Sequence, residues 1–368
     1  MKIGFDAKRA FHNRTGLGNY SRTLIHNLNS FYPEEEYLYF TPNPVSDYNH
    51  LFNPKQIITP TGTNPLWRSM GIKEDILRSE TDLFHGLSNE LPFGIHKTGI
   101  PSVVTIHDVI FDIVKADFPW HDRIIYRLKT KKCIRESTRI IAISAATKQD
   151  LIERFHADPA KISVIYQPID RQFYQPRLSK DDSDFIKSQY KLPAEYMLYV
   201  GALMKRKNIL PMIQAWERLP RADQIPLLIF GKGNHYEQEI KAYLHSRNLD
   251  DRVQVRTPVP FEHVPALYQL AETVLYPSLY EGFGLPVLEA LACGSKVVTS
   301  STSSMPEAGG KLPVYVNPYS IDSISEGIVK SLKHSPPDAV KVKEHLNTFD
   351  RVALTEQIMN LYRDITEK

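Results

Sequence analysis

Two glutamates eight residues apart, Glu281 and Glu289, lie in the stretch YEGFGLPVLEALACG. Gly282 and Gly284 let the backbone approach a ligand closely, and Pro286 suits the first turn of a helix. The residues that follow have a helical pattern, so both carboxylates can border one ligand at different depths. Carboxylates accept hydrogen bonds from paired sugar hydroxyls, and the N–H groups at a helix start favour an anion. On spacing alone, a surface helix with two solvated glutamates is an equal alternative.

A cluster of three cations, Lys205, Arg206 and Lys207, follows a strand-like run that ends at Gly201. In an open parallel sheet, ligands bind at the carboxyl ends of the strands. Clustered cations at such an end suit a pyrophosphate. A solvated basic loop is the alternative that these residues leave open.

His107 ends another strand-like run, in the stretch VVTIHDVIF. A histidine after a strand is more often a hydrogen-bonding structural residue than a catalyst, so both roles stay open on this evidence. Asp108 could orient the imidazole ring, as neighbouring carboxylates do, or it could cap the next segment.

Two glycine-containing segments also follow strand-like runs. In NRTGLGNYSRTL we expect Gly16 and Gly18 to form a loop before a helix, where backbone amides could reach a phosphate or the acceptor. A plain strand-to-helix turn is the alternative there. The second segment is LIFGKGNH, which contains Gly231 and Lys232.

Short apolar runs alternate with longer amphipathic stretches along the chain. This rhythm is typical of doubly wound parallel α/β sheets, and it restarts near residue 170. The 368 residues suit two domains of about 100–200 residues each. We expect strands in MKIGFDA, DLFHGLS, IPSVVTIHD, RIIAIS, KISVIYQ, EYMLYVGAL, IPLLIFGKG, RVQVRTP, AETVLYPS and SKVVTSS.

Composition argues against several classes of protein. A formal net charge of +3 is too small to indicate nucleic-acid binding, but it suits contact with phosphates or an anionic membrane surface. The two cysteines form neither a disulfide framework nor a metal motif. The N-terminus lacks the apolar core of a signal peptide, and no run of about 18 apolar residues could span a membrane. We expect a cytoplasmic protein.

A basic and roughly amphipathic segment, IYRLKTKKCIRES, covers residues 125–137. It could contact an anionic membrane or a lipid-pyrophosphate acceptor. A solvated helix face is the alternative. Any membrane contact would therefore be peripheral, on the cytoplasmic face.

The stretch PSLYEGFGLPVLEALACGSKVVTSSTSSMPE, over residues 277–307, resembles the E-x7-E signature of the retaining glycosyltransferases of family 4. Further matches occur in the same order along nearly the whole chain. The resemblance implies the GT-B fold, in which two Rossmann-like domains have parallel sheets that face each other across a deep cleft. It assigns residues 1–170 to the acceptor side and 171–348 to the nucleotide sugar. A last helix, over 349–368, would pack back on the first domain.

The resemblance also implies roles for the residues of the glutamate stretch. Glu281 takes the position that lies against the donor sugar, and Glu289 the position that binds the ribose hydroxyls. Phe283, Gly284 and Leu285 would offer backbone N–H groups to the sugar hydroxyls and the phosphate.

Other motifs match the family with some departures. Lys207 matches the lysine that holds the donor phosphates, but Ala202 stands where many members have an arginine, and Arg206 could supply that charge. His107 matches a histidine beside the donor sugar, and the first glycine segment matches a Gly-x-Gly loop. LIFGKGNH resembles the family's strand-plus-glycine element near the nucleotide, so Gly231 and Lys232 could border the base or phosphate. The hinge-like segment VIYQPID has Gln167 where asparagine is usual.

The implied activity is transfer of a hexose, with retention, from a nucleotide-diphosphate sugar to a glycan or lipid-linked acceptor in cell-surface polysaccharide synthesis. The IHDVIF and RKN features favour GDP-mannose as donor, and a UDP-sugar is the alternative. We expect no cofactor and no metal, because no cluster has metal-ligand spacing. His107, Lys207 and Glu281 are the candidate catalytic residues, and Arg206 and Lys207 would stabilise the leaving diphosphate.

Rival classes make different demands on the sequence. A sugar-nucleotide epimerase on the same fold would need no acceptor site, and a phosphorylase would need a pyridoxal lysine and a much longer chain. An NAD-dependent oxidoreductase would need G-x-G-x-x-G after the first strand, whereas TGLGNYS lacks the last glycine. A non-catalytic sugar-nucleotide binder could lose some of His107, Lys207, Glu281 and Glu289, and this chain has all four.

Overall fold

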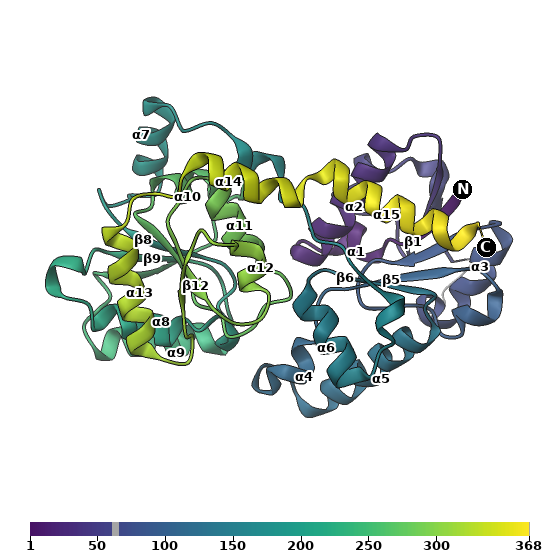
Figure 1. Cartoon of the computed structure of the whole chain (residues 1–368), viewed down its shortest axis with the longest axis horizontal. Coiled ribbons are helices and arrows are strands. Elements are labelled where there is room, and N and C mark those ends of the chain that lie inside the picture. Colours follow the sequence, from purple (N-terminus) through teal and green to yellow (C-terminus); the bar gives the residue numbers. More distant parts are fainter. Residues whose placement is uncertain (61–65, 368) are drawn as a thin grey trace. The chain divides into compact units, whose positions relative to one another are not determined.

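The computed structural model describes residues 1–60 and 66–367. The chain forms two compact units, one made of Met1–Pro168 with Asp350–Lys368 and the other of Ile169–Phe349. Each unit contains one parallel sheet with helices packed around it (Figure 1). The sequence-based division places its boundaries after residues 170 and 348.

The first unit contains a seven-stranded sheet in the order β3-β2-β1-β4-β5-β6-β7, with every neighbouring pair parallel. The order reverses between β1 and β4, which makes this the switch point of a doubly wound sheet. The strands are β1 (Lys2–Asp6), β2 (Glu36–Phe40), β3 (Ile57–Ile58), β4 (Leu83–Gly86), β5 (Ser102–Ile106), β6 (Arg139–Ala142) and β7 (Ile162–Val164).

Helices pack around this sheet, and several of them begin at side-chain caps. Ser144 Oγ accepts the Thr147 N–H at 3.0 Å, and Asp350 accepts the Val352 and Ala353 N–H groups. The helices are α1 (Lys8–His12), α2 (Gly16–Phe31), α3 (Ile72–Arg78), α4 (Ile110–Ile113), α5 (Trp120–Glu136), α6 (Ala145–Phe155) and α15 (Arg351–Thr366).

The second unit has a six-stranded parallel sheet in the order β10-β9-β8-β11-β12-β13, and its switch point lies between β8 and β11. Its strands are β8 (Met197–Val200), β9 (Leu227–Phe230), β10 (Val253–Arg256), β11 (Thr273–Tyr276), β12 (Val297–Ser300) and β13 (Val314–Val316). Its helices are α7 (Lys180–Gln189), α8 (Ile209–Glu217), α9 (His235–Ser246), α10 (Val264–Leu270), α11 (Leu285–Ala292), α12 (Met305–Gly309), α13 (Ile321–Lys333) and α14 (Ala339–Leu346).

The ten strands expected from the sequence all occur in these two sheets, whereas β2, β3 and β13 were not predicted. The α/β class and the doubly wound topology are therefore confirmed. Most strands are buried along nearly their whole length, as expected for parallel sheets with helices on both faces. In the described ranges, no helix combines the length and the apolar character needed to cross a bilayer.

The helix α15, near the end of the chain, belongs to the first unit and packs against α2 (Figure 1). Tyr362 on α15 lies 2.6 Å from His85 Nδ1, and the other ring nitrogen of His85 lies 2.8 Å from Thr105 Oγ1. Thr105 Oγ1 also lies 3.0 Å from the Tyr20 hydroxyl on α2. A buried polar chain thus ties α15 to β4, β5 and α2.

Candidate active site

The second sheet brings the basic cluster and the first glutamate together at its switch point. The loop after β8 carries Arg206 and Lys207, and the loop after β11 carries Glu281. Because β8 and β11 are parallel neighbours, their carboxyl ends open at the same edge of the sheet. Residues that are 74 and 75 positions apart in sequence therefore meet there.

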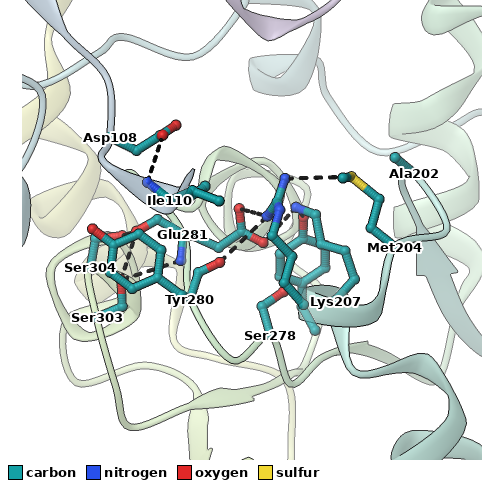
Figure 2. A network of polar contacts seen from close by, with 12 residues as sticks. Asp108, Ile110, Ala202, Met204, Lys207, Ser278, Tyr280, Glu281, Ser303 and Ser304 are labelled. Carbon is teal, nitrogen blue, oxygen red and sulfur yellow. Dashed lines mark hydrogen bonds and ion pairs between the residues drawn. The ribbon is translucent and has the colours of Figure 1, made fainter. Parts of the chain in front are cut away.

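Glu281 is held between the two cations (Figure 2). Its Oε1 lies 2.5 Å from Lys207 Nζ and its Oε2 lies 2.9 Å from Arg206 Nη1. Lys207 also donates to the Tyr276 hydroxyl at 2.5 Å. Lys207 and Glu281 are only 7% and 8% exposed. The result is a buried cluster with two positive charges and one negative charge.

The two cations determine the charge state of Glu281. Burial by itself would raise the pKa of this carboxyl, but the nearby Lys207 and Arg206 charges outweigh burial and lower the pKa below its ordinary value. Glu281 is therefore ionised at neutral pH. An ionised carboxylate that is paired on both oxygens is a poor nucleophile and a good electrostatic anchor.

Two serines that the sequence reasoning did not single out fix the backbone of Glu281. Ser303 Oγ donates to the Glu281 carbonyl at 2.6 Å and accepts its N–H at 3.2 Å, while Ser304 Oγ donates to the same carbonyl at 3.0 Å. Ser303 has φ +58°, a strained value for a residue other than glycine. The signal available in the sequence was a run of hydroxyl residues, SSTSS, which begins at the last residue of β12.

The glycine turn after Glu281 is required by packing. Gly284 has φ +109°, and a Cβ there would lie 2.4 Å from Met305 Cε. Phe283 is buried, with its ring 5.6 Å from that of Phe349. Leu285 begins α11, so the amides of Gly284 and Leu285 lie at a helix start, where N–H groups have no intrahelical partner. The expected helix start is confirmed, while the use of these amides by a ligand stays a prediction.

Glu289, in the second turn of α11, has an environment opposite to that of Glu281. Burial and the Asp170 carboxylate raise its pKa to about 8. At neutral pH the side chain is therefore largely protonated. Glu281 and Glu289 thus differ in charge, although they have the same side chain and lie eight residues apart.

We expect nucleotide binding to depend on pH through Glu289. The ionised carboxylate is the stronger acceptor for ribose hydroxyls, so affinity for a nucleoside diphosphate should rise from pH 6 to about 8, by up to about tenfold per unit, and then level off. The Glu289→Gln variant cannot ionise there and controls for titration of the phosphates. Isothermal titration calorimetry at several pH values measures both. Parallel curves for the two proteins would contradict the prediction.

Gly231 has a local role in the fold. A Cβ at this position would lie 2.0 Å from the Gly201 carbonyl oxygen. Glycine at residue 231 therefore lets the loop after β9 approach the loop after β8 closely. The Gly231 N–H donates to the Arg256 carbonyl at 3.0 Å. The predicted contact of Gly231 with a nucleotide therefore cannot come from its amide, and it stays a prediction for the surrounding loop.

The arginine position that departs from the family has a replacement nearby. Ala202, after Gly201, has no charged side chain, and its carbonyl accepts the Tyr199 hydroxyl at 2.9 Å. Arg206 contacts the same carboxylate as Lys207. Arg206 thus supplies a second cation to the cluster, four positions after Ala202 on the same loop.

The first glycine segment differs from the expectation. Gly16 and Gly18 form the first turn of α2 and not a loop before it, so that prediction was wrong. The Gly18 N–H donates to Thr15 O at 3.0 Å and to Asn13 Oδ1 at 3.1 Å, and a Cβ at Gly18 would lie 1.8 Å from Asn13 O. The glycine is explained by this close approach. The Asn13 side chain also accepts the Thr15 N–H, directly before the start of α2.

His107, in the first unit, is buried and neutral. Its Nε2 lies 3.0 Å from the Leu87 carbonyl, so this nitrogen carries the proton, and its Nδ1 accepts from the Gln167 amide at 3.1 Å. Burial lowers the pKa of His107 to about 4. Of the two roles open for Asp108, the carboxylate caps the next helix by accepting the Ile110 N–H at 3.1 Å. Gln167, which replaces the usual asparagine, was not expected to contact the ring.

Among the residues that the structure describes, neither unit contains a cluster of metal ligands. In residues 1–60 and 66–367, no group of three or more His, Cys, Asp or Glu side chains could hold a metal ion. Cys133 and Cys293 are both buried and form no disulfide.

Two family models match the chain in succession. The model "Glycosyltransferase Family 4" covers residues 16–173, and "Glycosyl transferases group 1" covers residues 181–347. The "O-antigen chain mannosyltransferase B" of Escherichia coli is 31% identical over 255 residues, which are 68% of this chain and 65% of that protein. The "O-antigen chain mannosyltransferase RfbU" of Salmonella typhimurium is 25% identical over 261 residues, 70% of this chain and 68% of that protein. This chain therefore matches about two thirds of each relative.

Among solved structures, HepE of Anabaena in complex with UDP has a TM-score of 0.75 at 17% sequence identity, over 99% of this chain and 100% of that one. Together with the two doubly wound sheets, this likeness defines an α/β protein of the GT-B fold class. The family models then identify it further: the chain belongs to the glycosyltransferases of family 4.

Proposed function

We propose that the protein is a retaining hexosyltransferase that uses a nucleotide-diphosphate sugar, with GDP-mannose as the leading candidate. The acceptor is a hydroxyl of a glycan or a lipid-linked sugar in polysaccharide synthesis. The observation that carries this proposal is the buried Glu281 carboxylate held by Lys207 and Arg206 at the switch point of the second sheet. A UDP-sugar is the alternative donor.

The cluster suits a diphosphate leaving group. When the anomeric C–O bond breaks, negative charge develops on the departing diphosphate, and Lys207 and Arg206 are already fixed in a low-dielectric site to stabilise it. The amides at the start of α11 add favourable potential for an anion. In this proposal the cations supply the charge that a divalent ion supplies in other transferases, so the reaction needs no metal.

The environment of Glu281 favours a front-face route over a double displacement. A carboxylate nucleophile needs a free oxygen, whereas both oxygens of Glu281 are ion-paired. In the front-face route the acceptor oxygen forms its bond to the anomeric carbon while the bond to the diphosphate breaks. The acceptor proton passes to a phosphate oxygen of the leaving group. Glu281 then positions the sugar and stabilises positive charge on its ring.

The choice of donor rests on the relatives. Two mannosyltransferases, by their names, are 31% and 25% identical to this chain, which favours mannose. HepE was solved with UDP but shares only 17% identity, so it supports a fold and leaves UDP-sugars as the alternative. A sugar-nucleotide epimerase is a weaker alternative, because it would give no transfer to an added acceptor. We place the reaction in the cytoplasm.

A thermal-shift panel without metal tests the proposal. GDP, UDP, ADP and their sugars are each added to the purified protein, and a bound ligand raises Tm by mass action. We expect Tm to rise only with the nucleotides of one base, and we expect Glu289→Ala to lose most of that rise. A flat response to the whole panel would remove the support for a sugar-nucleotide enzyme.

A further inference from the structure

Hydroxyl side chains at the end of β12 and in the loop after it donate to the carbonyls of one neighbouring segment, Tyr276–Glu281. This segment begins at the last residue of the parallel strand β11. The donors and the carbonyls that they bond are Thr299 with Tyr276 (2.9 Å), Ser300 with Ser278, Thr302 with Leu279 (3.3 Å), Ser303 with Glu281 (2.6 Å) and Ser304 with Glu281 (3.0 Å). We call these five side chains the hydroxyl ladder.

The hydroxyl ladder keeps the register of the two strands. β11 and β12 pair in parallel, and the last residues that pair are Tyr276 and Thr299. Each hydroxyl lies 22 or 23 positions after the residue whose carbonyl it bonds. The two loops therefore continue side by side beyond the backbone pairing, as far as Glu281. Side-chain hydrogen bonds replace the main-chain bonds of the sheet over this distance.

The segment held in this way carries two partners of the Lys207 ammonium. Lys207 Nζ lies 2.5 Å from the Tyr276 hydroxyl and 2.5 Å from Glu281 Oε1. Thr299 anchors the Tyr276 carbonyl, and the last two members of the hydroxyl ladder anchor the Glu281 carbonyl (Figure 2). The ladder therefore fixes how far apart the two groups that hold Lys207 can lie.

Burial and backbone conformation both indicate that the hydroxyls themselves matter. Thr299, Ser300 and Ser304 are 0% exposed, so the carbonyls that they bond would need other partners if the hydroxyls were removed. Ser303 has φ +58°, which glycine would adopt without strain. The Ser303 hydroxyl, which also accepts the Glu281 N–H at 3.2 Å, is thus what residue 303 adds to a plain turn.

We propose that the members of the hydroxyl ladder are positioning residues for sugar transfer, because they fix Tyr276 and Glu281 and, through them, the Lys207 ammonium. This inference rests on the proposed function, in which Lys207 and Glu281 act on the donor. Charges stabilise a transition state best when they are already in place, and a displacement of about 1 Å can cost about 100-fold in rate. Loss of a ladder hydroxyl should therefore lower kcat by about 10- to 100-fold and leave KM for the donor within about twofold.

Donor turnover and amide hydrogen exchange, measured on the same variants of the full chain, test the proposal. Turnover is the release of GDP from GDP-mannose, or of UDP from UDP-glucose, with water as the acceptor. The bond between the anomeric carbon and the diphosphate oxygen breaks, water supplies a hydroxyl to the sugar, and the remaining proton goes to the diphosphate. Exchange is followed by mass spectrometry of the peptide that covers Tyr276–Glu281. It needs no ligand and measures local opening of the segment.

Four variants separate positioning from stability. Ser303→Gly removes a hydroxyl and relieves the left-handed backbone, so we expect Tm to stay close to the wild-type value while kcat falls and the segment exchanges faster. Thr299→Val removes a hydroxyl from a buried side chain, and Thr299→Ser, which keeps the hydroxyl, should recover most of the lost kcat. The control is Ser331→Ala: Ser331 is buried and lies 2.8 Å from Thr273 Oγ1 at the other end of β11. This control should change neither kcat nor the exchange of the segment.

Two results would overturn the proposal. One is a wild-type kcat, or wild-type exchange of the segment, in both Ser303→Gly and Thr299→Val. The other is a loss of kcat that follows the loss of Tm in every variant, Ser331→Ala included, which would give the hydroxyls a structural role only. A wild type that releases nucleotide from neither donor would contradict the proposed function instead. The exchange comparison would then still decide whether the hydroxyl ladder fixes Tyr276 and Glu281.

Discussion

Replacing Lys207 with alanine is expected to lower kcat/KM for sugar transfer by about 10²–10³-fold. The Lys207 ammonium is buried and fixed by the Tyr276 hydroxyl and the Glu281 carboxylate, so it needs no reorganisation when charge develops on the diphosphate. In a site that excludes water its charge is weakly screened. Initial rates with the donor identified by thermal shift measure the effect.

Lys205 provides the matched control for this prediction. It belongs to the same KRK run, but its side chain is exposed and pairs with Glu239 at 3.2 Å. Exposed ion pairs contribute little, so Lys205→Ala should change kcat/KM by no more than about twofold. Equal losses in the two variants would mean that the run acts as a diffuse positive patch, and the fixed-cation account of the site would be wrong.

The second large effect is expected for Glu281→Gln. This change leaves Lys207 and Arg206 buried without their counter-charge, which costs about 3–5 kcal/mol in similar cases. For a domain of this size each kcal/mol corresponds to about 2–4 °C in Tm. A nucleoside diphosphate restores negative charge to the cations, so its stabilising shift should be larger in the variant than in the wild type, while turnover falls.

Glu289→Gln is expected to act in the opposite direction and serves as the control. Because the folded pKa of Glu289 is raised from 4.5 to about 8, the protein loses stability as pH rises from about 4.5 to about 8, and the loss is constant at higher pH. Removing the ionisable group should therefore leave Tm nearly unchanged below about pH 4 and raise it at pH 9. The lowered pKa of Glu281 has the reverse sign, so its stabilisation is present above its ordinary pKa and is lost as pH falls. Differential scanning fluorimetry across pH measures Tm for both variants. If both changed Tm in the same direction at pH 9, the opposite charge states given to Glu281 and Glu289 would be contradicted.

The sequence was most informative where strands consist of β-branched and aliphatic residues. Runs such as VVTI and KVVTS are short, buried on both faces and bounded by polar residues, so the strands could be placed. β2 was missed because its run, EYLYF, gains its apolar character from tyrosines, whose hydroxyls obscure the pattern. β13 has only three residues, too few for any periodicity.

The site was predictable to the extent that strand order determines it. The rule that ligands meet the carboxyl ends of parallel strands brought Lys207 and Glu281 into one hypothesis, and the structure joins them directly. This rule could not predict that Ser303 contacts Glu281 or that Gln167 contacts His107. A hydroxyl or amide that positions another residue has no characteristic spacing in the sequence. Gly18 was misplaced for a related reason: glycine permits close approach, but the sequence does not say whether the neighbour is a ligand or, as here, the Asn13 backbone.

The position of α15 has a consequence for biosynthesis. His85 and Tyr362 lie 277 residues apart, and the hydroxyl that contacts His85 Nδ1 comes from that distant helix. A ribosome therefore releases β1 to β7, and then the whole second unit, before the first unit can acquire its final helix. Domains usually fold in order from the N-terminus during synthesis, but here the second unit can finish first. Until α15 has been synthesised, His85 lacks its contact with the Tyr362 hydroxyl, and the side of α2 that packs against α15 stays uncovered.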